Sequence, residues 1–264
     1  MLLAIPFGVA LGLAVGMFGG GGSVLAVPIL VYVLSQSVAE ATTASLAVVA
    51  AGAIAGGLSH AQAGRVCWRH VGSFTAAAIP GIVVGTVAGD LVAPALLLAG
   101  FAVLMLAAAR ATWGRAGEHE PTAGDGWEPG GACPPLRLPR DVVAGAAIGF
   151  VTGFFGVGGG FLIVPTLAIA LAFTMRTAVG TSLAIITVTS VLGLATHLLA
   201  DRGLDAAVTA GMAFGCVVGA LAGASLAGRM PHRTLGRGFA VLVVGVAAYL
   251  LVSVALLDGP PGMA

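Results

Sequence analysis

The sequence predicts an all-α polytopic membrane protein built from two inverted repeats of five elements each. The chain of 264 residues is 59% hydrophobic and 8% charged, with a mean hydropathy of +1.09. It therefore lacks the polar surface that a soluble domain of this size presents to water. The chain also repeats itself, because the segment 16–28 reappears, shifted by 137 positions, as 153–165.

The repeat extends well beyond this segment. The same shift relates three further pairs, which are Gly8 and Gly145, Ser45 and Ser182, and His60 and His197. Duplicated units with interrupted helices are typical of transporters, whose binding site lies between the repeats near the membrane midplane. We divide the chain into a first repeat over 1–111, a polar linker over 112–140 and a second repeat over 141–264.

Apolar runs bounded by glycine, proline and charge define the elements. They span 2–18, 23–34, 42–59, 71–88 and 94–110 in the first repeat, and 142–155, 161–173, 178–199, 206–226 and 238–257 in the second. The first is interpreted as a membrane element and not a cleavable signal, because no basic region precedes it. A spanning helix needs about 20 residues, so the second element of each repeat is short. We expect each repeat to open with a glycine-broken helical hairpin, either re-entrant or short.

Evenly spaced glycines mark packing faces. They recur at every fourth position, at Gly8, Gly12, Gly16 and Gly20, at Gly145, Gly149 and Gly153, and at Gly211, Gly215, Gly219 and Gly223. Such a face carries hydrogen atoms in place of side chains, so another helix can approach closely.

Clustered glycines mark the candidate site. The residues are Gly19, Gly20, Gly21, Gly22 and Ser23 in the first repeat and Gly156, Gly158, Gly159 and Gly160 in the second. A helix that begins at Ser23 or Phe161 directs its N–H groups and the positive end of its dipole at the turn, which favours an anion. Inversion brings the two turns together between the repeats. The alternative is a tight turn packed against neighbouring helices. A nucleotide P-loop is excluded, because no Gly-Lys-Ser/Thr follows either cluster.

The third element of each repeat carries paired hydroxyl groups. Ser45 and Ser182 are equivalent in the two repeats, and Thr181 precedes Ser182. We interpret these three residues as candidate substrate contacts. The alternative is a hydrogen bond to the backbone one turn earlier, which is common for hydroxyls in membrane helices.

His60 and His197 end the third elements, at opposite faces of the membrane in an inverted arrangement. Because histidine titrates near neutral pH, both are candidates for gating or proton handling. The alternative is interfacial capping of the last helical turn.

The distribution of charge predicts the orientation. All eleven cationic residues are arginine, and an inverted arrangement places ten of them on one face and only Arg202 on the other. The positive-inside rule then puts the linker in the cytoplasm and both termini outside. No basic patch for nucleic acid is indicated.

The sequence predicts no metal site, cofactor or enzymatic activity. Cys67, Cys133 and Cys216 lack metal-ligand spacing and are expected to be free thiols. An enzyme needs a nucleophile with a base, or paired acids, and the apolar segments offer hydroxyls and two separated histidines.

The paired glycine signatures, Gly16 to Pro28 and Gly153 to Pro165, are each followed by an Ala/Thr-Ser-Leu segment. Together with the duplicated apolar architecture, they resemble the TauE/SafE family of sulfite-exporter-like membrane proteins. The resemblance implies a bacterial inner-membrane permease for sulfur-containing anions such as sulfite or organosulfonates. This chain departs from a strict repeat at Ser23, which is matched by Gly160, and its linker is long and acidic.

The sequence therefore predicts a secondary transporter of small sulfur-containing anions that works by alternating access within a lipid bilayer. The alternative is a passive anion channel, or a permease for another small organic anion. The sequence leaves open whether copies associate as a homo-oligomer.

Overall fold

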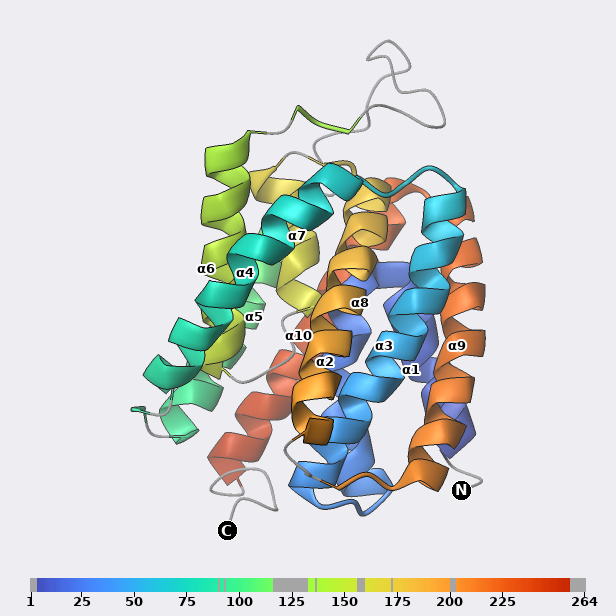
Figure 1. Ribbon diagram of the computed structural model, residues 1–264, viewed down its shortest axis with the longest axis vertical. Coiled ribbons are helices and arrows are strands. Elements are labelled where there is room, and N and C mark those ends of the chain that lie inside the picture. Colours follow the sequence, from blue (N-terminus) through green and yellow to red (C-terminus); the bar gives the residue numbers. More distant parts are fainter. Residues whose placement is uncertain are drawn as a thin grey trace.

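The computed structural model describes residues 4–89, 91–92, 94–115, 133–135, 137–155, 160–171, 173–199 and 203–256, and all regular structure within them is helical (Figure 1). The elements are α1 (Ala4–Phe18), a 3₁₀ segment η1 (Gly19–Gly22), α2 (Ser23–Pro28), a π segment η2 (Ile29–Val33), α3 (Val38–Gln62), α4 (Trp68–Gly89), α5 (Pro94–Arg115), α6 (Leu138–Phe155), α7 (Gly160–Ala170), α8 (Met175–Leu199), α9 (Ala206–Arg229) and α10 (His232–Leu256). The predicted all-α class is confirmed.

Several helices begin earlier than the apolar runs predicted. The first turn of α3 is polar, and Ser37 caps it by accepting a hydrogen bond from the Glu40 N–H, while Glu40 accepts one from the Ser37 N–H. This capping box satisfies amide groups that lack an intrahelical acceptor. These helices therefore include a polar first turn, and hydropathy alone places the start of each helix too late in the sequence.

Five of the described helices are long and apolar enough to cross a membrane: α3 from Glu40 onward, α4, α6, α8 and α9. Shorter apolar helices are α1 and the parts of α5 and α10 over 100–114 and 234–248. The protein is therefore a multi-pass membrane protein by the length and composition of its helices.

Two tight helix pairs each join the two halves of the chain. Helix α1 packs along α9, and α4 packs along α6. Gly12 of α1 lies against the backbone of Cys216, and Gly149 of α6 lies against the backbone of Ala78, so that a Cβ at either glycine would overlap a carbonyl group. The same contact is made by Gly8, Gly16, Gly145, Gly153, Gly215, Gly219 and Gly223. The predicted packing role of the spaced glycines is confirmed at these positions.

Helices α3 and α8 pack against each other in the middle of the molecule and run in opposite directions (Figure 1). At one end, Thr43 Oγ1 lies 3.2 Å from His197 Nδ1. At the other end, the Cα of Gly180 faces the Cβ of His60. The start of each helix therefore meets the end of the other.

The two halves also repeat local hydrogen bonds. The matched bonds are Gln36 N–H to Leu30 O and Phe173 N–H to Leu167 O, both 3.1 Å, and Ser45 Oγ to Thr42 O and Ser182 Oγ to Val179 O, both 2.8 Å. The members of each pair are related by the 137-residue shift of the sequence repeat. The repeats thus share backbone geometry as well as sequence.

The prediction of three free thiols was wrong for two of the cysteines. Cys67 and Cys133 form a disulfide across a sequence separation of 66 residues, whereas Cys216 is free and buried on α9. Cys67 precedes α4 and Cys133 precedes α6, and the packing of these two helices brings the thiols together. Nothing in the spacing of the cysteines indicates this contact.

Candidate functional site

The candidate site begins where α1 gives way to η1. Gly19 has a φ of +72°, a left-handed conformation that glycine adopts without steric cost. Its Cα lies against Ser182 Oγ of α8 and the side chain of Val164 of α7, so an added Cβ would overlap both. The glycine run of the first half is therefore seated on helices of the second half.

Gly20 contacts the start of α7. A Cβ on Gly20 would coincide with the backbone of Gly160, and a Cβ on Gly160 would press on Gly20 and on Ser23 Oγ. The structure thus brings together Gly20, Ser23 and Gly160, which sequence analysis assigned to one site. The predicted residues Gly156, Gly158 and Gly159 lie outside the described part of the chain.

Helix α2 does not start from an open turn at Ser23. Both the N–H and the Oγ of Ser23 donate to the carbonyl of Gly20, the latter at 2.7 Å. The segment η1, which includes Gly21, continues directly into α2, and Gly22 packs against Val15 and the Leu11 carbonyl of α1. The first turn of this half-helix is therefore the glycine run itself, one turn earlier than predicted.

The three predicted hydroxyl residues are buried and engaged with backbone groups. Ser45 and Ser182 each donate to a carbonyl three residues earlier on their own helix. Thr181 Oγ1 accepts a 3.1 Å hydrogen bond from the Cys67 N–H. Of the three, Ser182 lies directly at the glycine run, while Thr181 ties the start of α4 to α8.

The two predicted histidines occupy opposite ends of the α3–α8 pair. His60 is 1% exposed, and its Nε2 lies 3.4 Å from the Gly16 carbonyl of α1. His197 is half-buried and contacts Thr43 on α3. Both histidines thus connect their helix to a neighbour, and they do not lie together.

Two arginines approach each other at the end of α3. Arg65 lies in the loop before α4, and its guanidinium contacts Gly228 near the end of α9. Arg176 at the start of α8 donates a 2.8 Å hydrogen bond to the Met230 carbonyl. Partial burial, followed by the positive charge of Arg176, lowers the pKa of Arg65 from its ordinary value. Two partly buried cations with this mutual repulsion favour an anion beside them.

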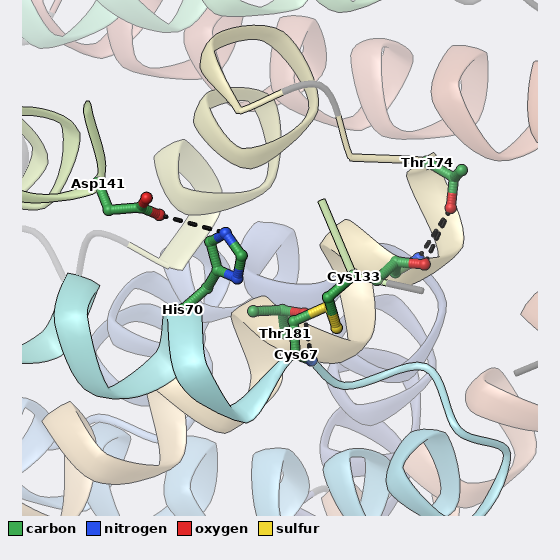
Figure 2. The surroundings of a disulfide bond; sticks show 7 residues. Cys67, His70, Cys133, Asp141, Thr174 and Thr181 are labelled. Atoms are coloured by element: carbon green, nitrogen blue, oxygen red, sulfur yellow. Dashed lines mark hydrogen bonds and ion pairs between the residues drawn. A yellow bond between two sulfur atoms is a disulfide. The ribbon is translucent and has the colours of Figure 1, made fainter. Parts of the chain in front are cut away.

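Sequence analysis missed a buried ionisable pair, which is shown in Figure 2 beside the disulfide. His70 Nε2 of α4 lies 3.5 Å from Asp141 Oδ1 of α6, with the side chains 2% and 1% exposed. The ring of Phe173 meets the His70 ring edge-on, with centroids 5.0 Å apart. Both ionisable residues lie in polar first turns, outside the apolar runs that defined the predicted elements.

A model of the family described as "Sulfite exporter TauE/SafE" matches residues 4–250. The chain belongs to the TauE/SafE family. The match includes both glycine-broken segments, both third elements and the linker between the halves.

Curated relatives support this membership and indicate a membrane transporter. A probable membrane transporter protein of Xylella fastidiosa strain 9a5c is 32% identical over 265 residues, which covers 95% of each chain. A similarly named protein of Methanocaldococcus jannaschii is 30% identical over 213 residues, covering 76% of this chain and 74% of the relative. No solved structure matches this TauE/SafE chain.

Proposed function

We propose that the protein is a secondary transporter that moves small sulfur-containing anions, of the sulfite or organosulfonate type, by alternating access. The contact between Gly20 and Gly160 carries this proposal, because it joins the helix break of one half to the break of the other. The name of the matching family supports the substrate class. The names of the relatives support transport across a membrane.

The proposal includes two inverted repeats that open with re-entrant hairpins. The opposed directions of α3 and α8 support the inversion. Helices α1 and α7 have 15 and 11 residues, or about 22 and 16 Å at 1.5 Å per residue. The hydrocarbon core is about 30 Å thick, so the described lengths of α1 and α7 fall short of it, and we place the two breaks inside the membrane.

Backbone amides supply the proposed anion site. The proposed donors are the N–H groups at the start of the 3₁₀ segment, at Gly19 and Gly20, and at the start of α7, at Gly160; Gly21, Gly22 and the Ser182 oxygen are proposed to line the same site. A helix start carries a partial positive charge, and this charge is effective where water is scarce. The repeat extends the proposed site to Ser45 and to Gly156, Gly158 and Gly159.

The proposed moving bodies are not the two repeats themselves. The tight pairs α1–α9 and α4–α6 each contain one helix from each half, locked by glycine-to-backbone contacts. Separating the halves would break both interfaces. We therefore place the motion between the two pairs, on either side of α3 and α8, with the glycine breaks between them.

The proposed location is the bacterial inner membrane, with the linker in the cytoplasm and both termini outside. Arg65 interacts electrostatically with Arg176, and it lies two residues before Cys67, which is bonded to Cys133 in the linker. Arg237 and Trp113, 5.5 Å apart, lie at the linker-proximal ends of α10 and α5. This gathering of arginine is typical of a cytoplasmic face.

Counterflow of radiolabelled sulfite in proteoliposomes tests the function. A transporter is expected to show saturable uptake that is accelerated by unlabelled sulfite loaded inside. The internal sulfite binds the site when it faces inward, and the loaded protein then returns to its outward-facing state. Uptake that rises linearly with the external sulfite concentration and is unaffected by internal sulfite would support the passive channel instead. Competition by sulfate, thiosulfate and small sulfonates then defines the substrate class.

A further inference from the structure

We infer that His70 and Asp141 form a proton-binding site that couples anion movement to a proton gradient; this inference rests on the proposed function. The pair is enclosed between α4 and α6, with Nε2 and Oδ1 3.5 Å apart. Among the described residues, neither carboxylate oxygen of Asp141 nor Nδ1 of His70 has a hydrogen-bond partner. Buried polar groups are ordinarily hydrogen-bonded, so this arrangement is costly and indicates a role other than stability.

The charge of the pair depends on a single proton. When the shared proton is on Asp141, both side chains are uncharged; when it is on His70, the two form a contact ion pair. In both cases the net charge of the pair is zero. Without that proton, Asp141 is a buried carboxylate beside a neutral imidazole. A buried uncompensated charge costs several kcal/mol. A change of packing that opens the interface around the pair would lower this cost, so the charge of the pair and the conformation of the two helices are linked, as a coupling site requires.

The charged side chains described on the elements around His70 and Asp141 are exposed or hydrogen-bonded elsewhere. Helix α7 carries no ionisable side chain, and the loop that follows it presents Phe173 to His70. Three arginines lie near the pair in the sequence, and all three are exposed: Arg69 on α4, Arg137 directly before α6 and Arg140 on α6. The guanidinium of Arg176, at the start of α8, is hydrogen-bonded to the Met230 carbonyl.

The repeat provides an internal comparison. The contact of Gly12 on α1 with Cys216 on α9 is equivalent to the contact of Gly149 on α6 with Ala78 on α4. Equivalent positions therefore differ by 137 residues between α1 and α6 and by 138 residues between α4 and α9. By these shifts, Asp141 corresponds to Ala4 and His70 to Val208. The same helix packing thus occurs in the α1–α9 pair with apolar residues at the two positions. The ionisable pair is not required to join these two helices.

The pair is connected to the glycine breaks through two neighbours. Phe173, in contact with His70, follows α7, whose first residue Gly160 contacts Gly20. The N–H of Cys67, three residues before His70, donates to Thr181, which adjoins Ser182 at Gly19. The pair is therefore linked to both sides of the proposed anion site, on one side along α7 and on the other through the start of α4 and its hydrogen bond to α8.

Proteoliposomes separate coupling from anion binding. In wild-type protein, an inward proton gradient is expected to alter net sulfite uptake, and a dye inside the vesicles is expected to report proton movement. In Asp141→Asn, both effects should be lost while sulfite counterflow persists, because exchange of bound anion requires no net proton transfer. His70→Gln should give the same separation. A merely structural role would lower counterflow and net uptake together.

Matched variants control for charge and packing. Asp205→Asn removes an exposed N-cap carboxylate of α9, and it should retain gradient-driven uptake. The double variant His70→Val/Asp141→Ala copies the apolar residues of the α1–α9 pair and should insert and fold. Gradient-driven uptake that persists in Asp141→Asn or in the double variant would overturn the inference. Loss of gradient-driven uptake in His197→Gln, with Asp141→Asn unaffected, would also overturn it.

Infrared spectroscopy distinguishes failure of this inference from failure of the proposed function. If wild-type protein shows no sulfite counterflow, the substrate assignment fails, and the proton site is then tested without a substrate. Acidification of wild-type protein should produce carboxyl or imidazolium difference bands that are absent in Asp141→Asn. Identical difference spectra in the two proteins would reject the proton site in either case.

Discussion

Arg65 lies outside the spanning helices, in the loop between α3 and α4, with its charge directed toward Arg176 and Gly228. Partial burial and the neighbouring cation both lower its pKa. An anion that arrives at this end of the molecule relieves the repulsion between the two guanidinium groups. The residue is thus suited to attract substrate before it reaches the glycine breaks.

Replacement of Arg65 by Gln should raise the KM for sulfite several-fold with little change in maximal flux. Partly exposed charge pairs contribute up to about 1 kcal/mol, and the effect should shrink at high ionic strength because salt screens it. Arg69→Gln, at an exposed position of α4, is the matched control. Equal effects in the two variants would show that overall charge matters and the Arg65–Arg176 pair does not.

Individual residues were the hardest feature to predict from the sequence. Most of the glycine and hydroxyl residues of the candidate site were singled out because the duplication marks them twice. His70 and Asp141 were missed because each occurs in one half only and in a polar first turn. The Cys67–Cys133 bond was missed for a related reason, since its partners meet only after α4 packs on α6.

At the scale of elements, close helix contact depends on the absence of side chains. Along α1–α9 and α4–α6, glycine Cα atoms lie directly on the carbonyl groups of the neighbouring helix. Membrane helices gain little from the hydrophobic effect when they associate, so dispersion contacts of this kind provide much of their affinity.

Gly12→Ala should destabilise the protein by about 1–3 kcal/mol, the usual range for overpacking a close contact. The added methyl group would overlap the Cys216 backbone. Gly245→Ala on α10 is the control, because no described atom of a neighbouring element lies within 4 Å of the position that its methyl group would occupy. Thermal unfolding in detergent measures both, and equal midpoints for the two variants would argue against the glycine interface.

The elements themselves were largely predictable, because hydropathy and glycine or proline boundaries reflect forces local to each segment. The break at Gly19–Gly22 was also located correctly. Its geometry was not, since the sequence suggested an open turn before Ser23, whereas η1 runs continuously into α2. The choice between these conformations depends on contacts with Gly160 and Ser182, which are remote in sequence.

At the scale of the whole molecule, the opposed α3 and α8 lie between two helix pairs, each drawn from both halves (Figure 1). This arrangement places equivalent histidines at opposite ends and gathers arginine near the linker. It also places the disulfide at the arginine-bearing end. The arginine bias places this end in the cytoplasm. Disulfides are rare in the cytoplasm, so the disulfide favours the opposite side of the membrane.

Thiol labelling in intact cells resolves this opposition. If the arginine-bearing end is cytoplasmic, Cys67 and Cys133 should be reduced and alkylated with a membrane-permeant reagent, and the bond should close only on added oxidant. A reporter enzyme fused to the C-terminus should be active only outside. A disulfide that is complete in cells, together with a cytoplasmic C-terminus, would reverse the proposed orientation.

The central claim is that the anion passes where the breaks of the two halves touch. The most direct test is sulfite counterflow in proteoliposomes that contain Gly20→Ala, because a methyl group there would overlap the Gly160 backbone. Gly72→Ala, at an open position of α4, is the control. Gly20→Ala is expected to fold and insert but to lose counterflow, whereas Gly72→Ala should retain it. Wild-type counterflow in a folded Gly20→Ala protein would contradict the account.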